Sequence, residues 1–259
     1  MRDPVFLLDE GDGPIVATAI HDSHATRPEI APLLAIDEAT RLREEDPFTG
    51  RLARVAPTTL IALRSRFEFD LNRSRDAAIY RTPAEAFGLD VWREPPPPEV
   101  VQRSLEGYDA FYQTLERVLR ERERRYGRFV VLDIHSYNHR RGGPGGAAAD
   151  PAKNPEINVG TGTVDRERWG PLLQRFCADL RRGDPQGGEL DVRENVKFRG
   201  GDMSRWVHRT FPETGCALAL EFKKTFMDEW TGELDEARLV ALGRALASTL
   251  PGLLESLRA

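Results

Sequence analysis

Three side chains that could bind a metal or transfer a proton each follow an apolar run that predicts a β-strand. They are His21 after residues 15–20, His135 after 129–134 and Glu221 after 216–220. In open α/β sheets, functional groups collect at the C-terminal ends of strands. Histidine and carboxylate side chains are also the usual protein ligands of a catalytic zinc ion, which keeps one further position for water. The pattern therefore predicts a metal-dependent hydrolase holding one divalent ion, expected to be zinc.

His21 and His135 are the first two predicted metal ligands, because they stand at equivalent strand ends. Asp133 lies two residues before His135, so strand alternation turns both side chains to one face, and Asp133 is expected to orient the imidazole. Two residues compete as the third ligand. His24 makes an H-x-x-H pair with His21, and Asp46 ends a charged helical stretch. Spacing alone leaves both open.

Glu221 is the predicted catalytic residue. A carboxylate beside a bound metal can accept a proton from water and return it to a leaving amine. The alternative role is a salt bridge to Lys223 or Lys224, which follow it closely in the sequence.

A second polar cluster could bind an acidic substrate. Asn72 and Arg73 belong to the segment Asp-Leu-Asn-Arg at 70–73, and Arg66 lies four residues before Asp70. Arginine holds a carboxylate through two parallel hydrogen bonds, and a neighbouring asparagine adds another polar contact. A simple turn is the alternative interpretation of this segment.

Gly200 and Gly201 leave bare backbone before a predicted helix, where amide groups can donate to an anionic or carbonyl oxygen. An ordinary glycine turn is the alternative. Ser136, directly after His135, completes the predicted substrate-binding set.

The composition describes an ordinary globular protein and excludes some functions. The 259 residues include 40% hydrophobic and 31% charged residues, with a net charge of −5. The acidic balance offers no electrostatic footprint for nucleic acid. No apolar segment reaches the 18 residues of a membrane span, and no secretory signal is visible, so we expect a cytoplasmic enzyme. The two cysteines, Cys177 and Cys216, are expected to be buried and reduced.

Strand-like and helical patterns alternate along the chain. Strands are predicted at 15–20, 58–63, 66–70, 129–134, 191–198 and 216–222, and helices at 37–44, 103–126, 165–182, 203–210 and 235–257. This alternation predicts an α/β fold with a mixed, largely parallel twisted sheet flanked by helices on both faces. We expect one domain over 1–259. The Gly-rich stretch at 140–155 follows the His135 strand, as either a lid over the site or a disordered insertion.

Six segments in order resemble motifs of the N-formylglutamate amidohydrolase family, relatives of the zinc carboxypeptidases. They are Ile20–Ser23, Glu45–Phe48 with Leu52, Asp70–Arg73, Leu132–Ser136, Asn195–Gly201, and Ala217–Glu221 followed by Phe226–Glu229. The resemblance implies a zinc carboxypeptidase-like fold with His21, Asp46 and His135 as ligands of one zinc ion and Glu221 as general base and acid. It also implies that Asn72 and Arg73 hold the substrate's carboxylate.

The chain departs from the family pattern around the expected pocket. His24 stands where the family usually has glycine, and Lys197 replaces a proline. We therefore expect a substrate of the N-acyl amino acid type, N-formylated or carrying another acyl group. The alternatives are a carboxypeptidase-like peptidase or deacylase acting on a short peptide, and a non-catalytic carboxylate-binding module. The sequence predicts no nucleic-acid or membrane partner.

Overall fold

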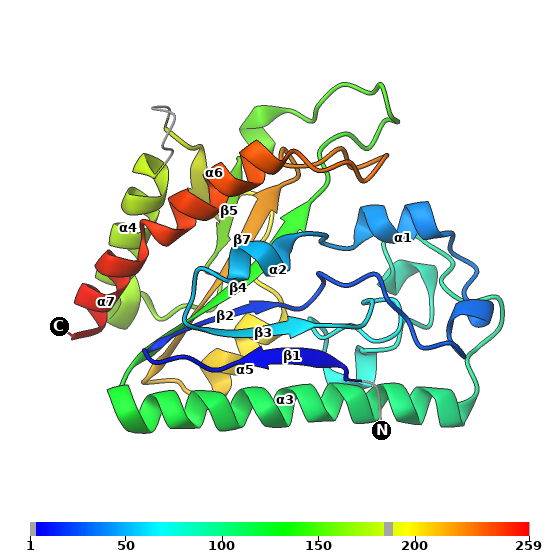
Figure 1. The fold of residues 1–259 in the computed structure, drawn as a ribbon, viewed down its shortest axis with the longest axis horizontal. Coiled ribbons are helices and arrows are strands. Elements are labelled where there is room, and N and C mark those ends of the chain that lie inside the picture. The colour runs from blue at the N-terminus through cyan, green and yellow to red at the C-terminus, as the bar shows by residue number, and fades with distance from the viewer. Residues whose placement is uncertain (1–3, 184–188, 259) are drawn as a thin grey trace.

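A computed structural model of the protein describes residues 4–183 and 189–258. Within this part of the chain, seven strands form one sheet in the order β1-β3-β2-β4-β7-β5-β6 (Figure 1). Pairing is parallel except between β1 and β3 and between β5 and β7. The strands are β1 (Phe6–Asp9), β2 (Ile15–Ala19), β3 (Thr58–Ala62), β4 (Phe129–Tyr137), β5 (Ile157–Gly160), β6 (Val192–Glu194) and β7 (Gly215–Lys223).

Helices cover both faces of this sheet (Figure 1). One core cluster joins the sheet to α3 and α5, and the other joins it to α2, α4, α6 and α7. The helices of the described residues are α1 (Glu38–Glu44), α2 (Thr49–Ala53), α3 (Pro98–Tyr126), α4 (Arg166–Arg182), α5 (Asp202–Thr210), α6 (Glu236–Ala247) and α7 (Leu250–Arg258). The predicted fold class is confirmed.

The central strands bring three chain segments to one edge of the sheet. Every residue of β2 and β4 is buried, as expected for strands covered on both faces. The parallel register pairs Thr18 with Asp133, and His135 with Glu221. His21 therefore leaves β2 at the same edge where His135 and Glu221 lie, near the ends of β4 and β7.

Several predicted elements differ from the observed ones. The predicted strand at 66–70 is wrong: these residues form a turn, in which the amide of Glu68 donates to the carbonyl of Ser65 at 3.0 Å. The helix predicted at 235–257 divides into α6 and α7 just before Pro251, because proline lacks an amide hydrogen and restricts the residue before it. Only part of the strand predicted at 191–198 is observed, as β6. Strands β1 and β5 and the short helix α2 were missed.

The long helix α3 begins earlier than predicted. Pro98 is its first residue, a position where the missing amide hydrogen is not needed. Gly127 ends the helix at a φ of +74°, a conformation that favours glycine. In the described part of the chain, no helix is both long and apolar enough to cross a membrane.

A candidate metal centre at the sheet edge

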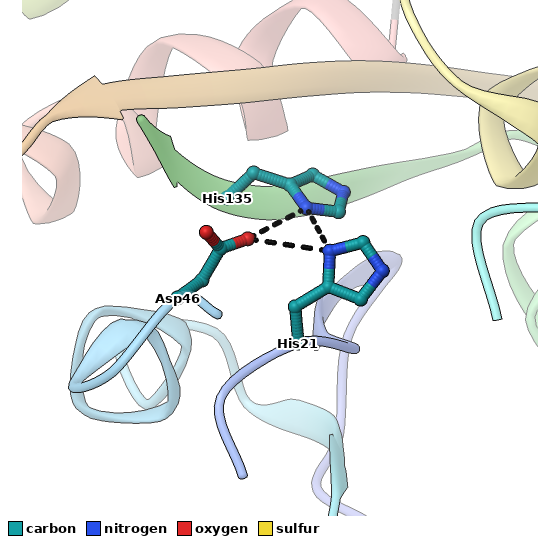
Figure 2. A group of neighbouring side chains, drawn as sticks. All are labelled: His21, Asp46 and His135. Atoms are coloured by element: carbon teal, nitrogen blue, oxygen red, sulfur yellow. Dashed lines mark hydrogen bonds and ion pairs between the residues drawn. The ribbon is translucent and has the colours of Figure 1, made fainter. Parts of the chain in front are cut away.

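His21, Asp46 and His135 converge on one point at the sheet edge (Figure 2). The His21 and His135 Nδ1 atoms lie 3.2 Å apart. The Asp46 Oδ2 atom lies 3.3 Å from His21 Nδ1 and 3.1 Å from His135 Nδ1. All three residues are buried, with exposed fractions of 1%, 3% and 2% respectively. The three atoms therefore form a nearly equilateral triangle of potential metal ligands.

This triangle fits the donor set of a divalent cation. In a tetrahedral zinc site with bonds of about 2.0–2.1 Å, neighbouring ligand atoms lie about 3.3–3.4 Å apart. Two imidazole nitrogens and a carboxylate oxygen are also the ligand types that zinc accepts. Burial opposes ionisation of Asp46, but the hydrogen bonds and charges of His135 and His21 outweigh it and hold the pKa of that carboxyl well below its usual range.

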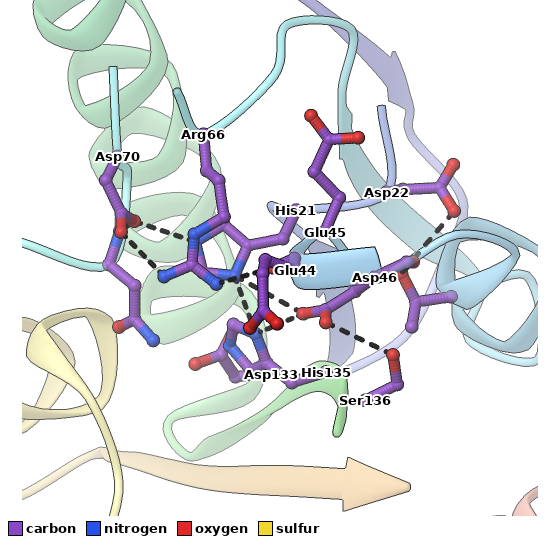
Figure 3. A network of polar contacts seen from close by, with 12 residues as sticks. His21, Asp22, Glu44, Glu45, Asp46, Arg66, Asp70, Asp133, His135 and Ser136 are labelled. Atoms are coloured by element: carbon purple, nitrogen blue, oxygen red, sulfur yellow. Dashed lines mark hydrogen bonds and ion pairs between the residues drawn. The ribbon is translucent and has the colours of Figure 1, made fainter. Parts of the chain in front are cut away.

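Asp70 fixes the orientation of His21 from the far side of the ring (Figure 3). Its Oδ1 lies 2.7 Å from His21 Nε2, and its Oδ2 accepts hydrogen bonds from Tyr80 and, at 2.8 Å, from Arg66. Burial opposes the charge of Asp70, but Arg66 and His21 keep the pKa of its carboxyl well below the usual range. An ionised Asp70 accepts the Nε2 hydrogen of His21, which leaves Nδ1 free to bind a metal.

Asp133 has the corresponding position behind His135. The two residues alternate on β4, and Asp133 Oδ1 lies 3.2 Å from His135 Nε2. Thr18 also donates to Asp133 Oδ1 at 2.9 Å. Burial opposes protonation of His135, but the negative charge of Asp133 and the hydrogen bond of Asp46 raise its pKa well above the usual value. Both histidines therefore present Nδ1 to the triangle and Nε2 to a buried carboxylate.

His24 lies outside the triangle, and both of its ring nitrogens are engaged. Nδ1 lies 2.6 Å from Glu45 Oε2, and Nε2 lies 3.0 Å from the Arg41 guanidinium. Asp46 instead lies next to His21, because its amide donates to the His21 carbonyl at 2.9 Å. Ser136 donates to Asp46 Oδ1 at 3.1 Å and helps to hold that carboxylate. This arrangement favours Asp46 over His24 as the third ligand.

Glu221 lies beside the triangle on β7, opposite His135 in the sheet register. Burial raises the pKa of its carboxyl to about 7, although the charge of His135 opposes the shift. Lys224, one of its alternative partners, instead donates to the carbonyl oxygens of Arg43 at 2.5 Å and Glu45 at 2.7 Å. Lys224 therefore ties the end of β7 to the segment that carries Asp46.

A cavity of about 350 Å³ opens onto these residues. Its lining includes every residue predicted to bind substrate: Arg66, Asn72, Arg73, Ser136, Gly200 and Gly201. The lining also contains Arg43, Arg199, Arg205 and Lys224, so cationic groups outnumber acidic ones around the metal triangle. Such a cavity suits an anionic ligand.

Asn72 and the glycine pair meet at one wall of the cavity. Asn72 Oδ1 accepts a hydrogen bond from the amide of Met203 at 3.2 Å, in the first turn of α5. A Cβ atom on Gly201 would lie 2.1 Å from that oxygen, so only glycine permits this contact. Gly200 has a φ of +103°, which also favours glycine. Arg73 donates to the carbonyl of Glu85 at 3.2 Å and is 42% exposed, which leaves part of its guanidinium facing outward.

The Gly-rich stretch after β4 lies at the edge of the same cavity. Arg141 lines the cavity, and its guanidinium makes two contacts of 3.1 Å with the carboxylate of Glu44. Asn138 donates to the same carboxylate at 3.3 Å. The role of this stretch as a lid stays a prediction.

Two features of the site were missed by sequence reasoning. The sequence assigns no role to Asp70, because its partner His21 lies 49 residues away. The sequence predicts Lys224 only as a partner of Glu221. The single signal that could have marked Asp70 was its place in Asp-Leu-Asn-Arg, because nothing in the spacing indicates contact with a histidine near residue 20.

The mixed sheet and the histidine–carboxylate cluster at its edge define a protein of mixed α/β architecture with a candidate metal site. The family model described as N-formylglutamate amidohydrolase matches residues 13–227. The chain therefore belongs to the N-formylglutamate amidohydrolase family, and the resemblance in its motifs is confirmed.

Two solved structures share this fold, and a third is a weaker match. An N-formylglutamate amidohydrolase from Ralstonia eutropha JMP134 is 19% identical with a TM-score of 0.75, and the match covers 98% of this chain and 97% of that one. A gene product of Agrobacterium tumefaciens is 18% identical with a TM-score of 0.62, covering 95% and 96%. A metallo-carboxypeptidase from Pseudomonas aeruginosa matches with a TM-score of 0.42 at 18% identity, covering 99% and 62%. A comparison with curated protein sequences finds no match.

Proposed function

We propose that the protein is a zinc-dependent amidohydrolase that cleaves the amide bond of an N-acyl amino acid or a related small carboxylate. One observation carries the proposal: the His21–Asp46–His135 triangle, Glu221 and the Asn72–Arg73 pair all line one cavity. Membership of an amidohydrolase family supports the same reaction type.

The three ligand residues would hold the zinc ion through His21 Nδ1, Asp46 Oδ2 and His135 Nδ1. A zinc ion held there would supply Lewis-acid chemistry and would make water a nucleophile at neutral pH. Glu221 accepts a proton from the attacking water and then donates it to the departing nitrogen, which avoids expulsion of an unstable amide anion.

Arginine side chains orient the substrate in this proposal. Arg66 is held by Asp70 and Tyr80 and borders the cavity, so its guanidinium can donate to the carbonyl oxygen as negative charge develops there. Asn72 and Arg73 hold the carboxylate of the amino acid. Holding the carboxylate and the carbonyl oxygen at the same time would orient the amide beside the three ligand residues.

The test is elemental analysis of the purified protein combined with a hydrolysis screen before and after chelation. We expect one zinc ion per chain and hydrolysis of at least one N-acyl amino acid, lost with a chelator and restored by zinc. Hydrolysis of short peptides alone would assign the peptidase alternative. No stoichiometric metal, together with carboxylate binding that survives chelation, would assign a binding module and refute the proposal.

A further inference from the structure

Phe87 stands at the cavity in an unfavourable conformation. It follows the 3-10 turn η3 (Pro83–Glu85), and its φ is +59°. Side chains with a Cβ atom rarely adopt this left-handed region, which asparagine and glycine tolerate best. The side chain is also 50% exposed, although large apolar residues are usually buried. Neither backbone preference nor core packing explains a phenylalanine at this position.

The contacts of Phe87 place its ring in the substrate cavity. Phe87 is part of the cavity lining, and its ring centroid lies 4.9 Å from the guanidinium carbon of Arg66. The ring of Phe87 also lies near the ring of Tyr80, with centroids 6.4 Å apart at an interplanar angle of 70°. Strained residues that persist in a fold concentrate at binding sites, where the conformation serves a ligand.

The loop of Phe87 is attached to the side of the cavity where the carboxylate of the amino acid is proposed to bind. Arg73 donates to the carbonyl of Glu85, two residues before Phe87, at 3.2 Å. The guanidinium carbon of Arg73 also lies 6.0 Å from the ring of Tyr80, which Phe87 contacts. Phe87, Arg66 and Arg73 therefore all lie beside the ring of Tyr80.

The cation beside Phe87 is already compensated. Arg66 pairs with Asp70 at 2.8 Å and donates to the hydroxyl of Tyr80 at 3.2 Å. The exposed face of the Phe87 ring is therefore an apolar surface beside a neutralised ion pair, and it offers no site for a second carboxylate.

We infer that Phe87 is a specificity-determining residue that packs against the side chain of the amino acid held by Arg73. This inference rests on the proposed function and narrows it. The preferred substrates are N-acyl amino acids with an aromatic or branched aliphatic side chain, rather than N-acyl glutamate.

The experiment compares two substrate series on the zinc-loaded enzyme. One series fixes an N-acetyl group and varies the amino acid as phenylalanine, leucine, alanine or glutamate; the other fixes the amino acid and varies the acyl chain. A contact of this type changes kcat/KM by about tenfold or more. We expect phenylalanine and leucine derivatives to exceed the alanine derivative by that factor.

The variant Phe87→Asn removes the ring and suits the left-handed backbone. We expect it to reduce the phenylalanine-to-alanine ratio to about 1, mainly through a lower kcat/KM for the phenylalanine derivative, and to melt no lower than the wild type. Phe87→Tyr should keep the preference. Leu7→Ala, which removes another exposed apolar side chain (47%) on β1, should change nothing. An unchanged ratio in Phe87→Asn, a change confined to the acyl series, or glutamate as the best amino acid would overturn the inference.

A binding measurement separates this inference from the proposed function. 3-Phenylpropionate and propionate are titrated into the protein and followed by calorimetry. We expect tighter binding of the phenyl compound by about tenfold, lost in Phe87→Asn. If no N-acyl amino acid is hydrolysed, the reaction is wrong while this titration still tests Phe87; equal affinity for both acids would refute the role of Phe87 alone.

Discussion

Replacing Asp70 with asparagine tests how the fold prepares His21 for metal binding. The carboxylate of Asp70 is fully buried and accepts hydrogen bonds from three side chains: His21, Arg66 and Tyr80. Its Oδ1 also accepts the amide of Asn72 at 2.7 Å. Asparagine keeps the shape of the side chain but provides one oxygen acceptor where aspartate has two.

The expected losses follow from these contacts. If the amide nitrogen faces His21, Nε2 must accept a hydrogen bond, and the ring proton moves to Nδ1, the atom needed for the metal. Loss of such a carboxylate partner lowers metal affinity about 10- to 100-fold, or about 1.4–2.7 kcal/mol. The guanidinium of Arg66, whose side chain is 11% exposed, also loses its paired charge. We expect the metal-free variant to lose about 3 kcal/mol of unfolding free energy, towards the lower end for a broken buried pair.

Asp133→Asn is the matched control. Asp133 lies 3.2 Å from His135 Nε2, whereas Asp70 lies 2.7 Å from His21 Nε2. The Asp133–His135 contact lacks hydrogen-bond geometry. Among the described residues, no arginine forms an ion pair with Asp133. Its replacement should therefore cost less in both affinity and stability.

The assay is competition for zinc against a chromophoric chelator, with urea denaturation of the metal-free proteins. Wild-type zinc affinity in Asp70→Asn, measured on a folded protein, would refute the proposed role of Asp70. A larger loss in Asp133→Asn than in Asp70→Asn would contradict the ranking drawn from the two distances.

Three further predictions concern Glu221, Lys224 and His208. Glu221→Gln should bind zinc stoichiometrically but lose about 10²- to 10⁴-fold in kcat, because proton transfer is removed; near-normal turnover would exclude Glu221 as the base. Lys224→Met should lower unfolding free energy by about 2–4 kcal/mol, because two buried carbonyls lose their donor, and the exposed control Lys153→Met should not. Burial lowers the pKa of His208 to about 4, below its unfolded value, so its stabilising effect is complete above pH 6.5 and is lost as pH falls towards 4. For this partly buried ring we expect a loss of about 1–3 kcal/mol of unfolding free energy. The urea midpoints of the wild type and of His208→Gln are compared at pH 7 and pH 4.5. An equal fall in both proteins would contradict this role of His208.

The strands that carry the site could be predicted from the sequence because burial on both faces leaves a plain signal. The run 129–134 is apolar without alternation, and β4 is buried along its whole length. The position of His135 near the end of such a strand follows directly. Strand β1 gave no comparable signal, because this four-residue edge strand alternates between partly buried and exposed positions.

The turn at 66–70 shows where periodicity fails as evidence. Phe67 and Phe69 alternate with polar residues, as in a half-buried strand, and both phenylalanines are buried. Glu68 between them is buried as well, because Arg27 pairs with it at 2.6 Å. A buried ion pair formed 41 residues apart therefore replaces the solvent face that alternation implies. The alternation of apolar and polar residues therefore does not by itself indicate an extended backbone.

The choice between His24 and Asp46 depended on information that spacing does not contain. The H-x-x-H pair would place both rings on one face only if the segment were helical, since residues three apart meet on a helix. The backbone after His21 continues without helix or strand through residue 27, and His24 turns to Glu45 instead. Asp46 approaches because its amide donates to the His21 carbonyl and because Lys224 holds the carbonyl of Glu45 beside it. The ligand set is thus determined by hydrogen bonds between segments 25 and 179 residues apart, which only the folded chain brings together.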